Sequence, residues 1–196
     1  MSSIFVSRAE NKLKDAVEAF GFDFRGKTVL DIGSSTGGFT EYALSCGAER
    51  VIAIEKGTNQ MKSPLRLDKR IELHEKTDIF RVASPGIRVP DVILADVSFV
   101  SLRKVLQHAK EYLSNSQTDF LVMLKPQFEA LDSQLNNGIV KNEKIRRIIV
   151  RDFESWLKQN NFLIYKKRDN AFLGKHGNQE RFYWLKLESS KSSKEK

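Results

Sequence analysis

Short apolar runs alternate with amphipathic segments along most of the chain. The runs are rich in Val, Ile, Leu and Phe, which is typical of buried strands. They cover residues 28–32, 51–54, 71–73, 92–95, 120–124, 162–165 and 182–187. Between them, apolar residues repeat at three- and four-residue spacings, most clearly over 102–113 and 145–157, which is typical of helices with one face on a core. The alternation predicts an α/β fold, with a mostly parallel seven-stranded sheet and helices on both faces.

The two ends of this pattern carry local signals. Ser7 followed by Glu10 forms a capping box, and the apolar spacing after it predicts a helix that runs to Phe20. A loop over residues 168–181 separates the last two apolar runs. The final strand is therefore expected to be antiparallel and to lie at the edge of the sheet.

Composition excludes several classes of protein. No repeat or linker interrupts residues 1–187 of the 196, which are expected to form one domain, and the Ser- and Lys-rich tail 188–196 has a composition typical of disorder. The single cysteine excludes a disulfide framework, and the three histidines lack metal-ligand spacing, so no metal is expected. The longest apolar runs are far shorter than the ~20 residues of a membrane-spanning helix, and the first residues lack a signal-peptide core. We therefore expect a cytoplasmic protein that inserts into no membrane.

The formal net charge of +8 is concentrated in one segment. Residues 141–168 hold nine Lys or Arg against three acidic residues. Such a field attracts a polyanion, either nucleic acid or an anionic membrane surface, although a solvated helix face has the same composition. In the helix predicted within this segment, Arg146, Arg147 and Arg151 are expected to lie away from the apolar stripe.

The most informative motif follows the first predicted strand. A glycine-rich turn and a helix start there expose backbone N–H groups, which favour an anionic or carboxylate-bearing ligand. Glu55 lies 22 residues after Gly33, at the end of the second strand, where an acidic residue binds a ribose diol. The pair predicts a cofactor that contains adenosine. The turn and its flanks supply the candidate binding residues Asp31, Gly33, Ser34, Ser35, Thr36, Gly37, Gly38 and Phe39.

Other interpretations of this turn are less well supported. Ser35 stands where a dinucleotide site needs its second glycine, which disfavours hydride-transfer cofactors. The turn also fits the G-x-S-x-G nucleophile elbow of hydrolases, and Asp169 and His176 follow in the order of a triad, but no oxyanion segment of the HGGG type exists. No Gly-Lys-Ser/Thr follows, so the turn is not a phosphate-binding P-loop.

S-adenosylmethionine fits the pattern better. Its methionine end would lie against Asp31 and the glycine turn, its ribose against Glu55 and its adenine near Asp78. Asp96 and Lys125 each follow a predicted strand directly. Because the carboxyl ends of parallel strands meet at one edge of a sheet, both side chains are expected to project into the same crevice.

Several separated motifs together resemble a known family. They are Phe5–Arg8, Leu30–Thr40, Asp96–Leu102, Leu124–Glu129, Gly138–Val140 and Gly177–Glu180. Over roughly residues 5–187 the chain is similar to the hemolysin-type (TlyA) rRNA methyltransferases, a branch of the FtsJ-like ribose 2′-O-methyltransferases. The resemblance implies a Rossmann-like S-adenosylmethionine-dependent methyltransferase that modifies a cytidine ribose of ribosomal RNA. Agreement in several motifs in order is more specific than one glycine turn.

The resemblance also implies a catalytic tetrad of Lys12, Asp96, Lys125 and Glu180. Lys125 would accept the proton of the hydroxyl or stabilise the developing alkoxide, and Asp96 would orient it and line the donor pocket. Lys12 and Glu180 would position the ribose. Without the resemblance, both would be interpreted as surface charges.

The residues near Asp96 bear on the methyl acceptor. Asp96 is followed by Val97-Ser98-Phe99, which lacks the two prolines and aromatic residue of base-amino methyltransferases, so a ribose hydroxyl is the expected acceptor. Cys46 is far from the crevice, which disfavours carbon-5 methylation of a pyrimidine. Phe99 and Phe128 are expected in the core rather than as base-stacking platforms.

RNA recognition is the point at which the chain departs from the family. The family carries an N-terminal S4 RNA-binding domain, and this chain begins at the opening motif of the catalytic domain, so we expect that domain to be absent. An RNA-binding partner or a second copy would then assist binding to ribosomal RNA or ribosomal subunits. Two other classes stay open, a noncatalytic RNA-binding or ribosome-assembly factor and a membrane-lytic protein. The residues expected to contact RNA are Arg8, Lys144, Arg146, Arg147 and Arg151.

Overall fold

A computed structural model describes residues 8–84, 86–174 and 177–188 of the chain. Within this part, the strands are β1 (Thr28–Ile32), β2 (Arg50–Ile54), β3 (Ile71–His74), β4 (Val92–Ala95), β5 (Asp119–Leu124), β6 (Leu135–Asn136), β7 (Ile139–Val140), β8 (Phe162–Asp169) and β9 (Arg181–Leu187). The helices are α1 (Arg8–Phe20), α2 (Gly38–Ser45), α3 (Ser63–Arg66), α4 (Leu102–Tyr112) and α5 (Glu143–Gln159). Short 3-10 turns lie at η1 (Ile79–Arg81), η2 (Pro126–Phe128) and η3 (Asp132–Gln134).

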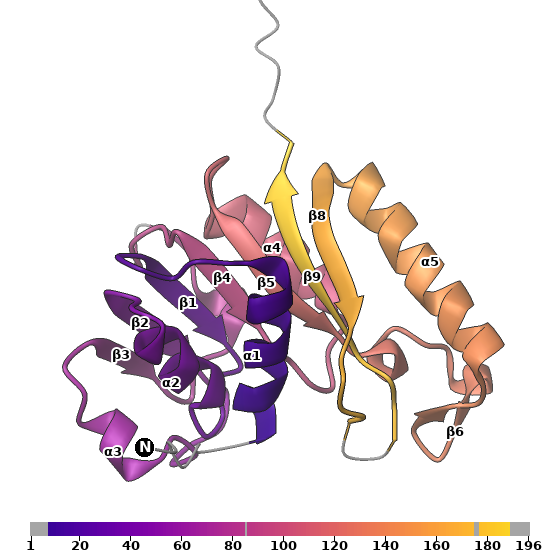
Figure 1. Ribbon diagram of the computed structural model, residues 1–196, viewed down its shortest axis with the longest axis horizontal. Helices are drawn as coiled ribbons and strands as arrows, with labels where there is room; N and C mark the ends of the chain where they lie inside the picture. Colours follow the sequence, from indigo (N-terminus) through magenta and orange to yellow (C-terminus); the bar gives the residue numbers. More distant parts are fainter. Residues whose placement is uncertain (1–7, 85, 175–176, 189–196) are drawn as a thin grey trace, which may run out of the picture.

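The predicted seven-stranded sheet is confirmed, in the order β3-β2-β1-β4-β5-β9-β8 (Figure 1). Strands β1 to β5 pair in parallel, and β9 pairs antiparallel with both β5 and β8. The expectation that the last strand lies at the edge is wrong, because β9 is interior and β8 is the edge strand. The burial of the two strands explains the arrangement. Phe182, Tyr183 and Leu185 of β9 are fully buried, whereas the exposed Lys166 and Lys167 of β8 suit an edge that must not pair with other chains.

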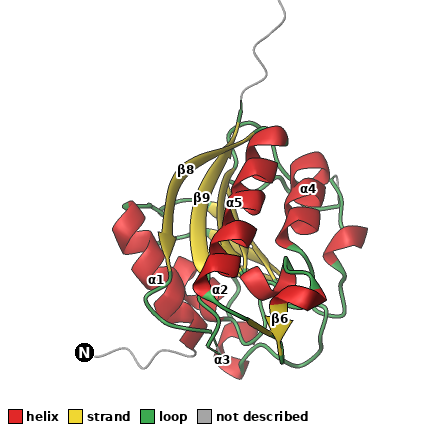
Figure 2. Ribbon diagram, turned by 90° about the vertical axis from the view of Figure 1, so that its right-hand side faces the viewer, coloured by secondary structure: helices red, strands yellow, loops and turns green. Residues whose placement is uncertain are grey.

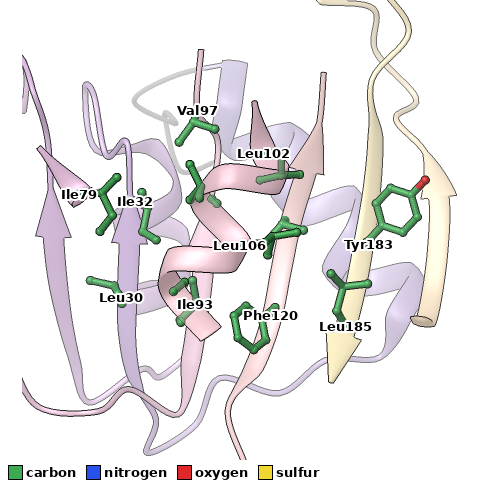
Figure 3. Packing of buried hydrophobic residues seen from close by; sticks show 14 of the residues in the cluster. Leu30, Ile32, Ile79, Ile93, Val97, Leu102, Leu106, Phe120, Tyr183 and Leu185 are labelled. Carbon is green, nitrogen blue, oxygen red and sulfur yellow. The ribbon is translucent and has the colours of Figure 1, made fainter. Parts of the chain in front are cut away.

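Helices cover both faces of the sheet, as the pattern predicted (Figure 2). One face packs against α4 and α5, and the other packs against α1 and α2. Successive residues of a buried strand alternate between these two cores: Leu30 and Ile32 of β1 face α4, while Val29 faces α1 and α2. Figure 3 shows part of the first core, where Leu106 of α4 and Phe120 of β5 pack among residues of neighbouring strands.

The apolar faces of the long helices are buried in these two cores. Leu13 and Phe20 of α1, Leu106 of α4, and Phe153 and Leu157 of α5 are all buried. No helix in the described part of the chain is long and apolar enough to span a membrane. The capping-box residue Ser7, and the tail from residue 189 onward, lie outside the described residues.

The parallel strands β1 to β5 all end at one edge of the sheet, the lower edge in Figure 1. Asp96 follows β4 and Lys125 follows β5, and these strands are neighbours in the sheet. β9 runs the opposite way, so its first residue lies at the same edge, with Arg181 opposite Leu124. Glu180 and Lys125 therefore lie at the ends of adjacent strands.

Candidate functional site

The carboxyl edge of the sheet carries a cavity of about 650 Å³ beyond the ends of β1, β2 and β4. Its wall includes Gly33, Glu55, Asp78 and Asp96. A second cavity of about 200 Å³ follows the glycine-rich turn and includes Lys125. Because Gly33 and Asp96 line both, the two cavities adjoin. The volume of the larger cavity falls within the range of sites for small molecules and cofactors.

Most of the turn faces the smaller cavity, as a ligand-binding turn requires. Gly37 lies between lining residues, and its φ of 94° strains any residue with a side chain there, which the Leu65 side chain would also crowd. At Gly33, with φ 81°, a Cβ would lie 3.1 Å from the carbonyl oxygen of Asp96. The lining residues of the turn are Gly33, Ser34, Ser35, Thr36, Gly38 and Phe39, although the ring of Phe39 itself packs in the core.

Asp31 lies buried beneath this turn. Thr40 Oγ1 donates a 2.6 Å hydrogen bond to Oδ2, and Oδ1 has no partner among the described residues. Burial raises the pKa of Asp31 to about 7, the Thr40 hydrogen bond opposes this shift, and the negative charge of Asp96 adds to it. The Oγ of Ser34 is also buried without a described partner. Buried polar atoms are normally paired, so these two favour a ligand that supplies the missing partners.

Two acidic residues lie at the other end of the larger cavity. Glu55, at the end of β2, accepts hydrogen bonds from the backbone N–H of Ser35 at 2.9 Å and of Gly57 at 2.6 Å, and from Gln60 Nε2 at 3.3 Å. A carboxylate has about four acceptor positions, so one remains for a ligand hydroxyl. Asp78 accepts hydrogen bonds from the backbone N–H of Phe80 in η1 at 3.1 Å and from Lys56 Nζ at 3.2 Å, which together lower its pKa.

An ion pair closes the crevice at the ends of β4 and β5. Lys125 Nζ lies 2.7 Å from Asp96 Oδ1, and it donates a 2.7 Å hydrogen bond to Ser98 Oγ. The two charged side chains are 12% and 19% exposed. Partial burial strengthens such a pair relative to a surface one, so Asp96 fixes where the ammonium points. Ser98 was not singled out from the sequence, although it lies within the motif that supplied Asp96.

A second ion pair lies next along the same edge. Lys12 Nζ of α1 is 2.5 Å from Glu180 Oε2, and the side chain of Glu180 is only 4% exposed. The structure therefore brings the four tetrad positions from α1, β4, β5 and β9 to one edge. The Gly177–Glu180 segment, flagged only by resemblance, approaches Lys12 through folding alone.

Glu129 links the loop after β4 to the loop after β5, and it was missed as an individual residue. Its carboxylate accepts from Ser101 Oγ at 2.8 Å and from the backbone N–H of Leu102 at 2.6 Å, and Arg103 Nε lies 3.3 Å away. Burial raises the pKa of Glu129. The loop after Lys125 thus caps the helix that follows Asp96. The only sequence signal was that Glu129 ends a motif.

The expectation that Phe99 belongs to the core is wrong. Its side chain is 93% exposed, it borders the larger cavity, and its φ of 62° lies in the left-handed region that a bulky residue rarely adopts. Phe128 is partly buried, with its ring centroid 5.3 Å from that of Phe99. An exposed aromatic ring held in strained backbone beside a cavity is a feature of ligand contacts rather than of packing.

The basic residues on α5 divide into two groups. Lys144, Arg147 and Arg151 are exposed. The expectation that Arg146 also points outward is wrong, because its side chain is 7% exposed and pairs with Asp169 and with Glu143. Its guanidinium also donates to a backbone carbonyl at 3.1 Å, so it is held inside by a complete set of acceptors. Arg8 begins α1, and its side chain lies outside the described residues.

The hydrolase interpretation of the turn finds no support in the described residues. Ser35 Oγ donates to Gln60 Oε1 at 3.2 Å, and Asp169 is bound by Arg146 and Arg181 rather than aimed at the turn. His176 lies outside the described residues. Within the described part of the chain, no three His, Cys, Asp or Glu side chains cluster closely enough to hold a metal ion.

Comparison with known proteins agrees with this geometry. The FtsJ-like methyltransferase model matches residues 5–187. The 23S rRNA (cytidine-2′-O)-methyltransferase TlyA of Campylobacter jejuni is 35% identical over 187 residues, which cover 94% of this chain and 72% of that protein. A solved structure from Streptococcus thermophilus, described as a candidate hemolysin, superposes with a TM-score of 0.91 at 31% identity, covering 97% of this chain and 70% of the other.

A more distant structure shares only the fold. The S-adenosylmethionine-dependent methyltransferase of Mesorhizobium loti superposes with a TM-score of 0.62 at 12% identity, covering 88% of this chain and 96% of the other. The family match spans nearly the whole chain and includes every motif around the crevice. The chain therefore belongs to the FtsJ-like methyltransferase family.

Proposed function

We propose that this protein transfers a methyl group from S-adenosylmethionine to the ribose 2′-hydroxyl of a cytidine in ribosomal RNA, in the cytoplasm. S-adenosylmethionine is the cofactor that the family and its fold imply. The observation that carries the proposal is the Lys125–Asp96 ion pair, at 2.7 Å, where Asp96 also lines the larger, cofactor-sized cavity. The ribose and cytidine assignments rest on the family and on the named relative from Campylobacter jejuni.

The crevice suits this cofactor on chemical grounds. Glu55 would accept a ribose hydroxyl, and Asp78 would lie near the adenine. The methionine end would follow the turn, where Gly33 lets the backbone of Asp96 approach closely. The unpartnered oxygens of Asp31 and Ser34 would there hydrogen-bond to the ligand. The buried carboxyl of Asp31 also favours a ligand with positive charge, because such charge stabilises its ionised form.

The tetrad residues would prepare the acceptor hydroxyl. When bound, the cofactor supplies a methyl group on a positively charged sulfur. A ribose hydroxyl is a weak acid, so its oxygen needs a base or a nearby positive charge to attack. Lys125 would stabilise the developing alkoxide as an ammonium, or would accept the proton as an amine after it has itself lost one, while Asp96 and Ser98 hold its Nζ in position.

Lys12 and Glu180 would hold the rest of the nucleotide. Their ion pair lies beside Lys125 because Arg181 pairs with Leu124 in the sheet. The buried carboxylate of Glu180 could accept a ribose hydroxyl, and Lys12 could contact a phosphate. This arrangement supports ribose as the acceptor, since alignment of hydroxyl and methyl group is the main requirement of an in-line transfer.

The exposed basic residues of α5 would bind the phosphate backbone. The side chains concerned are Lys144, Arg147 and Arg151. Their attraction to phosphates does not depend on the nucleotide sequence of the RNA. The 2′-hydroxyl itself distinguishes RNA from DNA. A second copy or an RNA-binding partner could add affinity, and ribosomal subunits are the natural substrate to test.

Incubation with methyl-labelled S-adenosylmethionine and unmodified ribosomal subunits tests the proposal directly. After digestion to nucleosides, the expected product is labelled 2′-O-methylcytidine. Label on a base would overturn the roles given to the tetrad but keep the cofactor. Absence of label on both subunits and free ribosomal RNA, with cofactor binding intact, would contradict the proposal.

A further inference from the structure

Asn178 carries a buried amide that no step above uses. Its side chain is 5% exposed. Oδ1 accepts a 3.0 Å hydrogen bond from the backbone N–H of Val140, and Nδ2 donates a 3.0 Å hydrogen bond to the carbonyl oxygen of Gly138. The amide thus binds the β6–β7 hairpin as the peptide group of a neighbouring strand would. Both polar ends of the amide are satisfied by this one hairpin.

The hairpin lies at the catalytic edge. It belongs to the segment that follows Lys125, and Figures 1 and 2 show β6 at the same lower edge as the loops of the crevice, below α5. Pro126, Val140 and Asn178 line a small cavity of about 130 Å³ between the hairpin and the start of α5. The hairpin therefore bridges the loop of Lys125 and the basic helix.

The outer side of the hairpin is open to a ligand. Asn136, Asn137 and Gly138 at its tip are exposed, and Ile139 is 37% exposed. Amide side chains and free backbone groups of this kind hydrogen-bond to sugars and base edges of RNA. The chain then enters α5, whose exposed Lys144 follows within the first turn. The surface thus passes from the polar amides of the hairpin to the positive charge of α5, with the exposed Glu143 between them.

Glu180 is held independently of Asn178, although only Gln179 separates them. The carbonyl of Gln179 accepts from Arg146 Nε at 3.1 Å, and Gln179 Nε2 donates to the carbonyl of Asn170 at 2.6 Å. The backbone N–H of Asn170 in turn donates to the carbonyl of Glu180 at 2.9 Å. Loss of the Asn178 amide would therefore release the hairpin and leave Glu180 in place.

We propose that the β6–β7 hairpin is an RNA-binding arm beside the acceptor site and that Asn178 is its positioning residue. The inference rests on the proposed function, because it assigns part of the RNA contact to a named segment. Asn178 acts through the hairpin and touches neither cofactor nor reacting atoms.

Asn178→Ala tests the inference through three readouts. Loss of one buried hydrogen-bonding group is expected to raise KM and Kd for ribosomal RNA by about tenfold. kcat and the affinity for S-adenosylmethionine should stay within about twofold, since the tetrad and the turn are untouched. The amide of Val140 should exchange its hydrogen faster. Gln117→Ala, an exposed amide at the opposite edge of the sheet, is the matched control and should change none of these.

Asn178→Asp separates positioning from general loss of stability. The new carboxylate keeps an acceptor for Val140 but places an oxygen against the carbonyl of Gly138. At about pH 6 a larger fraction of the carboxyl is protonated and can donate, so the ratio of its KM to that of the wild type should be smaller than at about pH 8. A mere packing defect would not give this dependence.

The outcomes separate the two proposals. Faster exchange at Val140 with unchanged Kd and KM would overturn the RNA-binding role of the hairpin. Unchanged hydrogen exchange at Val140 would overturn the role of Asn178 as the positioning residue of the hairpin. If the wild-type protein methylates no RNA, the proposed function fails, but the Kd of each variant for ribosomal RNA still decides the inference.

Discussion

In the proposed reaction, Lys125 would lie beside the transferred methyl group and the ribose oxygen that accepts it. Its ammonium is held by Asp96 and Ser98, each at 2.7 Å, so its orientation does not depend on the ligand. A preoriented charge of this kind acts on the transition state without reorganisation. It also lies at the edge of the cofactor cavity rather than within the turn, so rate and cofactor affinity should separate on mutation.

We expect Lys125→Ala to lower kcat by about 10³-fold, the range typical of a lost acid–base or charge-stabilising group. Cofactor affinity should change little, because the glycine turn, Glu55 and Asp78 remain. Single-turnover methylation and calorimetric binding of S-adenosylhomocysteine measure the two quantities. Equal loss of both would show that Lys125 serves the cofactor pocket instead.

Asp31 gives the protein a pH dependence of stability. Its ordinary pKa is 3.8 and burial raises it to about 7 in the folded state, so the folded protein holds the proton more tightly than the unfolded chain. The stability due to this proton is complete below about pH 4 and is lost as pH rises through 7. The free energy of unfolding of Asp31→Asn, compared with that of the wild type, should therefore rise by about 3 kcal/mol from about pH 5 to about pH 8. Urea unfolding of both proteins at the two pH values measures this change. The same difference in free energy of unfolding at both pH values would contradict the prediction.

Phe99 is expected to affect RNA binding but not stability. Its ring is 93% exposed, so its removal costs no buried area, and Phe99→Ala should shift the free energy of unfolding by no more than about 0.5 kcal/mol. If the ring stacks on a base of the acceptor strand, about 1–3 kcal/mol of binding is lost. Thermal unfolding and KM for ribosomal subunits measure the two effects. An unchanged KM would mean that no base contacts Phe99.

At the scale of elements, position along the chain predicts some site residues and not others. Asp96 and Lys125 follow buried strands, and parallel strands bring such residues together, so local pattern was sufficient. Lys12 and Glu180 are 168 positions apart, and nothing in either neighbourhood indicates that folding will pair them. The place of β9 was missed for a similar reason, since apolar content shows that a strand is buried but not between which neighbours.

Helix α4 depends on a cap that comes from another loop. Glu129 satisfies the backbone N–H of Leu102 and the hydroxyl of Ser101, both at the start of the helix. Its loss would leave buried donors unpaired, so Glu129→Ala should lower the free energy of unfolding by about 1–2 kcal/mol. The exposed Glu111→Ala on the same helix is the control. Equal, small effects in denaturant unfolding would show that the cap contributes nothing.

At the scale of the molecule, the formal net charge of +8 overstates the charge available to RNA. Several cations of the basic segment are neutralised within the fold: Arg146 is buried between carboxylates, and Lys167 pairs with Glu154 at 2.7 Å. Composition located the positive segment, but only the structure shows which of its cations face solvent. Arg146 does not point outward from α5 as expected, because it pairs with Asp169 of β8 and with Glu143 in the first turn of its own helix.

The exposed basic face of α5 should dominate the salt dependence of RNA binding. Each phosphate contact adds about 0.7 to the slope of log K against log salt for single-stranded RNA, so Lys144, Arg147 and Arg151 together should account for a slope of about 2. Replacing all three by Ala should lower affinity for ribosomal RNA at low salt and flatten that slope by the same amount. Arg147 belongs to the set because its exposed pair with Glu143 is weak and phosphate can displace it.

The control is a second triple variant, in which Lys27, Lys69 and Lys104 are replaced by Ala. It loses the same charge away from α5 and should keep the wild-type slope. Equal flattening in both variants would show that RNA responds to net charge alone and that α5 is not its binding face.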